Sequence, residues 1–445
     1  MDRRRFLAGT ASLTAATAAT AANSLSTAEN RDAAGELTRA LNPRIAADRQ
    51  AALTLLKPDA RTLERGLRLH AESIVFDGYG FSPRAALDGT RYAAAVTGGA
   101  SDRELKDLRE DMSMTRYVTD PGEQREYRDA WRASGVTCIF QNAGEEGQDP
   151  LRLIKRLARF TYATDMLGEV VSKAALPNDV VLAKQQGRHS LYFTGNGVPL
   201  TQQWNSIPDE LRYLKIFFQL GIRMMHLTYQ RRNMIGDGCA EKANAGLSDF
   251  GRSVIAEMNR VGVIPDCAHS GWQTSLEAAQ VSTRPVVASH TVAGAIYPHI
   301  RSKPDEVIKA IADSGGYVGI CCISRFLRGA GDISAFLDHI DYVVRKFGAD
   351  HAALGTDVAY SSQNSAAESK KVPRRRRTRK EFRSLWPADD FKTTSEMTNS
   401  LAWTNWPLFT VGLVQRGHSD EVIRKILGGN VMRVARDAMK AGESA

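Results

Sequence analysis

Eight short apolar runs, rich in Val, Ile and aromatic residues, recur along the chain and alternate with segments of helical periodicity. Continuous apolar strands of this kind predict a parallel sheet that is covered by helices. Eight of them predict an α/β fold of the closed (β/α)8 TIM-barrel type. The runs lie at 73–77, 136–142, 190–195, 222–228, 261–266, 285–290, 316–322 and 351–357, and helical segments between them include 249–260, 304–315 and 333–348.

The alternative to a barrel is an open, doubly wound sheet. No GxGxxG motif follows the first apolar run, so nothing favours a dinucleotide-binding fold. We therefore expect one barrel domain at 73–440, preceded by a helical extension at 31–72. The late segment with Ser419 as its N-cap is predicted to be a helix that stops at Gly428 and Gly429.

The first 30 residues differ in composition from the rest of the chain. The opening MDRRRFLAG places a run of arginines directly before Phe-Leu, and a weakly apolar Ala/Thr stretch follows as far as the small residues ATA at 19–21. This pattern resembles a bacterial twin-arginine export signal with a cleavage site near residue 21. We expect residues 1–30 to be a signal peptide and the mature protein to be periplasmic or secreted.

The net charge of +9 is concentrated in one segment. Residues 370–383 hold nine Lys and Arg and one Glu, so the rest of the chain is close to neutral. We expect a solvated insertion at about 365–390 rather than a nucleic-acid interface, because no aromatic stacking pattern accompanies the charge. No apolar run in the body of the chain is long enough to be a transmembrane segment. The five cysteines are odd in number and mostly lie in apolar runs, so no disulfide framework is expected.

Polar side chains stand at the ends of the apolar runs, where a barrel places its active site. The run 261–266 leads to His269, a second run ends on His290, and the last run ends on Asp357. Neutral imidazoles and a carboxylate are ligands that zinc takes, so the pattern predicts a metal-binding or catalytic site. The alternative is that each histidine is a core residue bonded to a backbone carbonyl. The remaining histidines, His226 among them, lie in expected helices, loops or strand interiors and receive no site role.

Longer motifs in the same regions resemble the membrane (renal) dipeptidase family, zinc peptidases of the amidohydrolase superfamily. The resembling segments occur in family order between about residues 70 and 440. They are LGIRMMHLTYQRRN, AGLSDFGRSVIAEMNRVGVIPDCAHS, RPVVASHT, HIRSKPDEVIKAIADSGG, LGTD and RGHSDEVIRKILGGNVMRV. The resemblance implies a TIM barrel of the metallo-dependent hydrolase type. It also implies two zinc ions, which share a bridging carboxylate and an activated water that attacks a dipeptide carbonyl.

The resemblance assigns roles to four residues by position. It places His269 and His290 on one zinc ion. It assigns two roles to Asp357, which are to bind metal and to accept the proton of the attacking water. It assigns to Arg301 the binding of the C-terminal carboxylate of the substrate, a role for which the guanidinium fork is suited. It also favours a homodimer.

Four other positions depart from the family pattern. Where the family has His-x-Asp after its first strand, this sequence has Tyr79 and Phe81. Thr194 stands in place of the bridging Glu, and Tyr229 in place of a substrate-polarising His. Phenylalanine cannot bind zinc, and neutral Tyr or Thr oxygens are poor ligands. We therefore expect one Zn²⁺ ion rather than two, with no ion as the alternative.

Three functions fit such a site. The first is hydrolysis of a small peptide or amide substrate that carries a carboxylate, with one metal ion on His269, His290 and Asp357. The second is a catalytically inactive barrel that binds a carboxylate ligand through Arg301. The third is a metal-independent isomerase or lyase. The retained histidines, Asp357 and Arg301 favour the first.

In the hydrolytic interpretation, Asp357 is the general base and Tyr229 donates a hydrogen bond to the developing oxyanion. Tyr79 could make the same donation, and with Thr194 it is expected to line the substrate site.

Overall fold

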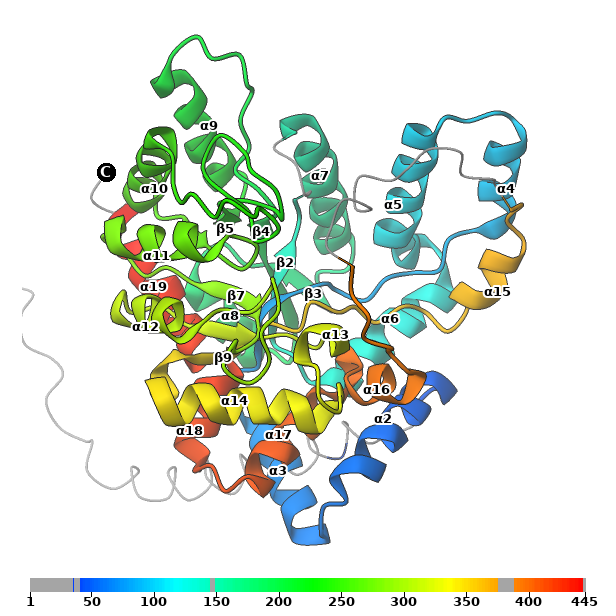
Figure 1. The fold of residues 1–445 in the computed structure, drawn as a ribbon. Coiled ribbons are helices and arrows are strands. Elements are labelled where there is room, and N and C mark those ends of the chain that lie inside the picture. Colours follow the sequence, from blue (N-terminus) through cyan, green and yellow to red (C-terminus); the bar gives the residue numbers. More distant parts are fainter. Residues whose placement is uncertain (1–34, 36–40, 145–148, 375–387, 443–445) are drawn as a thin grey trace, which may run out of the picture.

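Eight parallel strands circle the centre of the computed structural model, and helices surround them (Figure 1). The structure describes Gly35 and residues 41–144, 149–374 and 388–442. The predicted export signal at 1–30 and residues 375–387 of the predicted basic insertion lie outside the described residues.

The strands form two hydrogen-bonded sheets in which all neighbours are parallel. The first sheet contains, in this order, β1 (Phe76–Gly80), β2 (Cys138–Asn142), β4 (His189–Gly195), β5 (Ile222–His226) and β6 (Ile264–Asp266), and the short β3 (Val171–Lys173) pairs with the start of β4. The second sheet contains β7 (Ala288–Thr291), β8 (Val318–Ile320) and β9 (Ala352–Leu354).

Backbone contacts join the two sheets into a ring. A parallel bridge pairs Asp266, at the end of β6, with Val287, just before β7. On the other side, the backbone N–H of Asp357 donates to the carbonyl of Tyr79 in β1 at 3.0 Å. The predicted TIM barrel is therefore confirmed, and each of the eight predicted apolar runs supplies one strand of the ring. The additional strand β3 was not predicted.

The helices supply the outer layer and the connections. Those of the first half are α2 (Pro43–Leu56), α3 (Ala60–Glu72), α4 (Gly89–Thr97), α5 (Asp102–Thr119), α6 (Pro121–Ser134), α7 (Pro150–Met166), α8 (Pro177–Gln185) and α9 (Ile207–Gln219). Those of the second half are α10 (Asp249–Val261), α11 (Trp272–Val281), α12 (Asp305–Asp313), α13 (Ser324–Leu327), α14 (Ile333–Phe347), α15 (Ser365–Lys370), α16 (Ser395–Ser400), α17 (Trp406–Gln415), α18 (Asp420–Arg424) and α19 (Asn430–Gly442). No helix in the described part of the chain is both long enough and apolar enough to cross a membrane.

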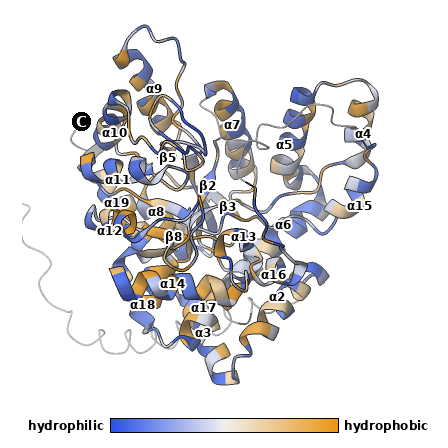
Figure 2. Cartoon of the chain, viewed as in Figure 1, coloured by the Kyte–Doolittle hydropathy of each residue, from blue (hydrophilic) through white to orange (hydrophobic). Residues whose placement is uncertain are grey.

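The helices form where the sequence periodicity and capping residues predict them. The side chain of Ser248 accepts a hydrogen bond from Gly251 N at the start of α10, and Gly262 ends this helix with a φ of 94°. The apolar faces pack on the strands, and Figure 2 shows the hydrophobic colour on the central strands and α17. Inside the ring, the Phe76 and Phe140 rings stack with centroids 5.1 Å apart, so aromatic side chains fill the barrel beneath its mouth.

The expected helix stop at Gly428 and Gly429 is wrong, although Ser419 does cap α18. The chain continues from α18 through one π-helical turn, Lys425–Gly429, directly into α19. A Cβ atom on Gly428 would lie 2.4 Å from the carbonyl oxygen of Ile74. This glycine therefore permits close packing of the helix on the chain that leads into β1, rather than a turn out of the helix.

Candidate active site

Three imidazole rings gather at the carboxyl ends of neighbouring strands. His226 is the last residue of β5, His269 follows β6, and His290 lies in β7. The ring centroids are 5.2 Å apart for His226 and His269, 5.2 Å for His226 and His290, and 4.9 Å for His269 and His290. All three side chains are buried. The strand ends therefore bring together the two predicted histidines and a third, His226, that the sequence interpretation had left without a site role.

The two predicted histidines face each other through their Nε2 atoms, which lie 2.9 Å apart. Burial lowers the pKa of both His269 and His290 well below the usual 6.5, and the positive charge of Arg301 adds to this effect. Both rings are therefore neutral at physiological pH. A neutral ring offers one lone pair, which is the form in which histidine binds a metal ion.

Asp266 is a buried carboxylate that holds this cluster in place. Its Oδ1 accepts the backbone N–H groups of Ala268 at 2.9 Å and Ser289 at 3.0 Å. Its Oδ2 accepts the Ser289 hydroxyl and lies 2.7 Å from Nε2 of His226. Burial alone would raise the pKa of Asp266, but the contacts with His226 and Ser289 outweigh it and hold the pKa below its ordinary value. Asp266 is therefore anionic.

The same hydrogen bonds fix the protonation of His290. The Ser289 hydroxyl donates its one proton to Asp266, so its oxygen can only accept from His290 Nδ1, which is 2.8 Å away. The proton of His290 therefore sits on Nδ1. Its lone pair is on Nε2, the atom that faces His269.

Two tyrosines pack flat against these rings. The Tyr79 ring stacks on His290 with centroids 3.8 Å apart, and the Tyr229 ring stacks on His269 at 4.0 Å. The Tyr79 hydroxyl donates to Oδ1 of Asn196 at 2.5 Å. The Thr194 hydroxyl donates to the carbonyl of Met224 in β5 at 3.0 Å. The hydroxyl protons of Tyr79 and Thr194 are thus bonded within the protein, and the expectation that these residues line the substrate site stays a prediction.

Asp357 and Arg301 are two further charged residues close to the histidine cluster. Asp357 follows β9 in the left-handed region, with a φ of 56°. Burial raises its pKa to about 6, although the positive charges of Arg301 and Arg84 act in the opposite direction. The Arg301 guanidinium is buried and donates to the carbonyl of His290 at 2.9 Å. It retains further N–H groups, since arginine has five donors.

The residues at the mouth fit a metal ion. In the described part of the chain, one group of three His, Cys, Asp or Glu side chains has ligand atoms all within 4.8 Å of one another, namely His226, Asp266 and His290. The predicted set of His269, His290 and Asp357 is not such a group. Both ring nitrogens of His226 and Nδ1 of His269 are buried and have no hydrogen-bond partner among the described residues, although Nε2 of His226 lies 2.7 Å from Oδ2 of Asp266. Neutral imidazoles beside a carboxylate are a donor set that suits zinc.

His226 and Asp266 were missed, although the sequence carried a signal for both. Each is the last polar residue of an apolar strand, as His290 is. What could not be read was that both side chains turn towards the ring centre, because an apolar strand buried on both faces shows no alternation.

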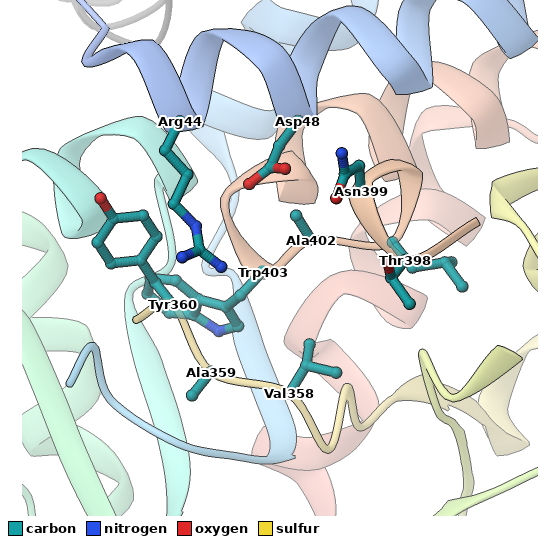
Figure 3. Close-up of a pocket in the computed structure, with 10 residues that line it drawn as sticks. Arg44, Asp48, Val358, Ala359, Tyr360, Thr398, Asn399, Ala402 and Trp403 are labelled. Atoms are coloured by element: carbon teal, nitrogen blue, oxygen red, sulfur yellow. The ribbon is translucent and has the colours of Figure 1, made fainter. Parts of the chain in front are cut away.

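A cavity of about 210 Å³ lies away from this cluster (Figure 3). It lies between α2 and the chain after β9, and Arg44, Asp48, Tyr360 and Trp403 are among the residues that line it. None of the three histidines belongs to its lining.

A parallel β/α barrel with imidazoles and carboxylates at its C-terminal mouth defines the class of TIM-barrel metallo-dependent hydrolases. Within this class, the family described as membrane dipeptidase (peptidase family M19) matches residues 64–374. The chain belongs to this family, and the predicted family membership is confirmed.

Individual relatives agree with this assignment. Dipeptidase tcpJ of Claviceps purpurea (strain 20.1) is 26% identical over 326 residues, which are 72% of this chain and 64% of that protein. An amidohydrolase from Pseudomonas aeruginosa has a similar structure, with a TM-score of 0.59 and 26% identity over 84% of this chain and 98% of that one. The probable dipeptidase PvdM from Pseudomonas aeruginosa also has a TM-score of 0.59, with 18% identity over 86% of this chain and 100% of that one.

Proposed function

We propose that this chain is a dipeptidase-like hydrolase that cleaves a small peptide or amide with one metal ion instead of two. The observation that carries the proposal is the pair of neutral imidazoles, His269 and His290, whose Nε2 atoms lie 2.9 Å apart at the barrel mouth. The positions that would hold a second ion carry Tyr79 and Phe81, and neither side chain is a competent zinc ligand.

His269 and His290 would hold the ion, and Zn²⁺ is the metal that fits imidazole ligands of this kind. When bound, the ion lowers the pKa of water and polarises the carbonyl of the scissile bond. Asp357 takes the proton of the attacking water, a role that suits a carboxylate with a pKa of about 6. Tyr229 packs on His269 at the rim, where its hydroxyl donates to the oxyanion that forms on the carbonyl.

Arg301 binds the C-terminal carboxylate of the substrate. The guanidinium donates a hydrogen bond to the His290 carbonyl and lies above the Phe326 ring, 5.1 Å from the ring centroid. These two contacts hold it in a fixed orientation. A fixed guanidinium can offer two parallel N–H groups to a carboxylate without losing further side-chain freedom.

Metal analysis with an activity assay tests the proposal. Protein purified without added metal is expected to contain about one zinc ion per chain, and a chelator should remove the ion and the hydrolysis of a dipeptide panel together. Turnover without an ion would replace the proposal by isomerase or lyase chemistry. A protein without turnover that is stabilised by carboxylate ligands would replace it by a binding function.

We also propose that the protein is exported through the twin-arginine route. The support is the sequence RRRFL at residues 3–7. The precursor with Arg3→Lys and Arg4→Lys should remain in the cytoplasm, whereas the unchanged chain should appear in the periplasm or medium. Export of the double variant at the normal level would exclude this route.

A further inference from the structure

We infer that the cavity between α2 and the chain after β9 is a second ligand site, which takes a free α-amino acid in its zwitterionic form (Figure 3). The cavity lies apart from the histidine cluster, and none of the three histidines lines it. Binding there does not depend on the proposed hydrolysis. The guanidinium of Arg44 binds the α-carboxylate of the ligand, and the carboxylate of Asp48 binds its α-ammonium group.

Two opposite charges reach the cavity from one helix. Arg44 and Asp48 are four residues apart in α2, so they lie on the same face of the helix, one turn from each other. Figure 3 shows both side chains directed from α2 into the cavity. Neither charged group forms a hydrogen bond or an ion pair with a described residue. The two groups are therefore available to the two charges of a ligand.

The Asp48 carboxylate gives the stronger argument for a ligand. The residue is 7% exposed, and burial raises its pKa to about 6, although the positive charge of Arg44 acts in the opposite direction. A buried carboxylate without a partner is costly, so such groups are paired in most folded proteins. The ammonium group of a bound amino acid supplies the missing partner of Asp48.

Arg44 is held at the edge of the cavity by an aromatic ring. Its Cζ lies 5.7 Å from the centroid of the Tyr360 ring, which is within the range of a cation–π contact. Tyr360 is fixed in turn, because its hydroxyl donates to Glu126 at 2.6 Å and accepts from the Asn42 amide at 2.9 Å. The guanidinium thus has a preferred position and keeps its N–H groups for a carboxylate.

The rest of the lining limits the size and the side chain of the ligand. Its apolar part consists of Val358, Ala359, Leu401, Ala402 and the indole of Trp403. The volume of about 210 Å³ is below the roughly 300–1,000 Å³ of sites for drug-sized molecules. A molecule with an ammonium group, a carboxylate and an aliphatic side chain, such as leucine, matches the two charges, the apolar wall and the volume.

The walls of the cavity are connected to the segment that carries Asp357. Val358 follows Asp357 directly in the chain. Trp403 donates through Nε1 to Asp77 at 3.2 Å, and Asp77 accepts the backbone N–H and the hydroxyl of Thr356. A ligand in the cavity therefore contacts two groups next to the proposed general base. The consequence that an amino acid released by hydrolysis changes kcat rests on the proposed function.

Calorimetric titration of the full-length protein with leucine tests the binding. N-acetylleucine lacks the ammonium group and isopentylamine lacks the carboxylate, so each should bind at least about tenfold more weakly than leucine. Asp48→Asn and Arg44→Gln should each weaken leucine binding by a similar factor. Asp48→Asn is expected to fold normally, because the carboxylate has no partner to lose, and urea unfolding verifies this.

The matched controls are Lys309→Gln and Asp313→Asn, at an exposed ion pair with the same spacing on α12. Both should bind leucine like the unchanged protein. A second measurement needs no variant. A photoreactive diazirine analogue of leucine should label peptides that contain residues 358–360 or 398–403, as identified by mass spectrometry.

Labelling confined to the barrel mouth, or a folded Asp48→Asn variant that binds leucine within threefold of the unchanged protein, would overturn the second site. Leucine that binds in the cavity but leaves kcat for a dipeptide unchanged would overturn the effect on Asp357 alone. Binding and cavity labelling in a protein without hydrolysis would remove the proposed function and leave the site. Hydrolysis without leucine binding in the cavity would do the reverse.

Discussion

The ring of Tyr79 lies flat on the ring of His290, with centroids 3.8 Å apart and an interplanar angle of 15°. The resemblance places a metal-binding histidine at position 79, so a group expected to hold an ion has become a group that packs against one of the remaining imidazoles. The stacked ring restricts rotation of His290 from one side, while Ser289 fixes its Nδ1 from the other. Position 79 therefore contributes to the site through the orientation of His290.

We predict that Tyr79→Phe and Tyr79→Leu differ in metal affinity. The phenylalanine keeps the stacked ring and loses only the bond to Asn196, so zinc affinity should stay within about threefold of the unchanged protein. The leucine removes the ring, and zinc affinity should fall about 10-fold or more, since groups that orient ligands are worth 10–100-fold. Competition with a chelator dye measures both. Equal affinities in the two variants would show that stacking does not orient His290.

Replacement of Asp357 should separate catalysis from metal binding. Asp357→Asn should lower kcat about 10²–10⁴-fold, because the general base is lost, and should leave about one zinc ion per chain. Asp313→Asn, at an exposed ion pair with Lys309, is the control and should keep full activity. A variant that loses its zinc would instead make Asp357 a ligand.

The pH profile of the unchanged enzyme should reflect the same carboxyl group. Its pKa is raised to about 6, and the base works only when it is ionised. Activity should therefore be constant above about pH 6 and fall about tenfold per pH unit below it. A profile that remains flat down to pH 4 would exclude Asp357 as the base.

Much of the fold could be predicted because each barrel strand lies in a mainly apolar run of the sequence. The placement of His290 and Asp357 at the mouth could be predicted from one rule, which is that parallel strands of a barrel present their carboxyl ends at the same mouth. That rule also brought His269 and His290 to the same place, and their Nε2 atoms lie 2.9 Å apart.

The rest of the site depends on which way each side chain turns. His226 lies in IRMMHLT, where every neighbour is buried. The sequence therefore shows no alternation of polar and apolar residues that would tell which side chains face the barrel interior and which face the helices. The Asp266 contacts with Ser289 and His226 join three different strands, and no local pattern encodes them. Gly428 was misread for a similar reason, since its contact with the Ile74 carbonyl is distant in sequence.

Arg301 should discriminate between substrates that differ only at the C-terminus. Arg301→Lys replaces two directed N–H donors by a point charge, so KM for a dipeptide should rise about 10–100-fold, which corresponds to about 1.4–2.7 kcal/mol lost from a charged hydrogen bond. The matching dipeptide amide lacks the carboxylate, and its KM should change little between the unchanged enzyme and the variant. Equal increases in KM for the dipeptide and its amide would show that Arg301 supports the His290 backbone and does not bind the substrate carboxylate.

Asp77 in β1 should stabilise the segment after β9 that carries Asp357. Its carboxylate accepts Thr356 N at 2.9 Å, the Thr356 hydroxyl at 2.6 Å and Nε1 of Trp403 at 3.2 Å. Asp77→Asn places an amide N–H₂ among these donors, so the free energy of unfolding should fall by about 1–3 kcal/mol. Thr356→Val removes one donor only and should cost about 1 kcal/mol. Urea unfolding measures both changes. An Asp77→Asn variant with an unchanged free energy of unfolding would contradict the stabilising role of Asp77.

The acid sensitivity of the fold should depend in part on His70. This ring is buried and bonded in its neutral form, and burial lowers its pKa from 6.5 to about 3. Below pH 6.5 the unfolded chain takes up a proton that the folded chain does not, so the stability contributed by the neutral ring is lost as the pH falls towards 3. One such histidine adds a slope of about 1.4 kcal/mol per pH unit over this window. His70→Gln cannot titrate, so its free energy of unfolding, measured with urea between pH 6 and pH 4, should fall less steeply than that of the unchanged protein by about this amount. Parallel lines for the two proteins would show that His70 is protonated in the folded state.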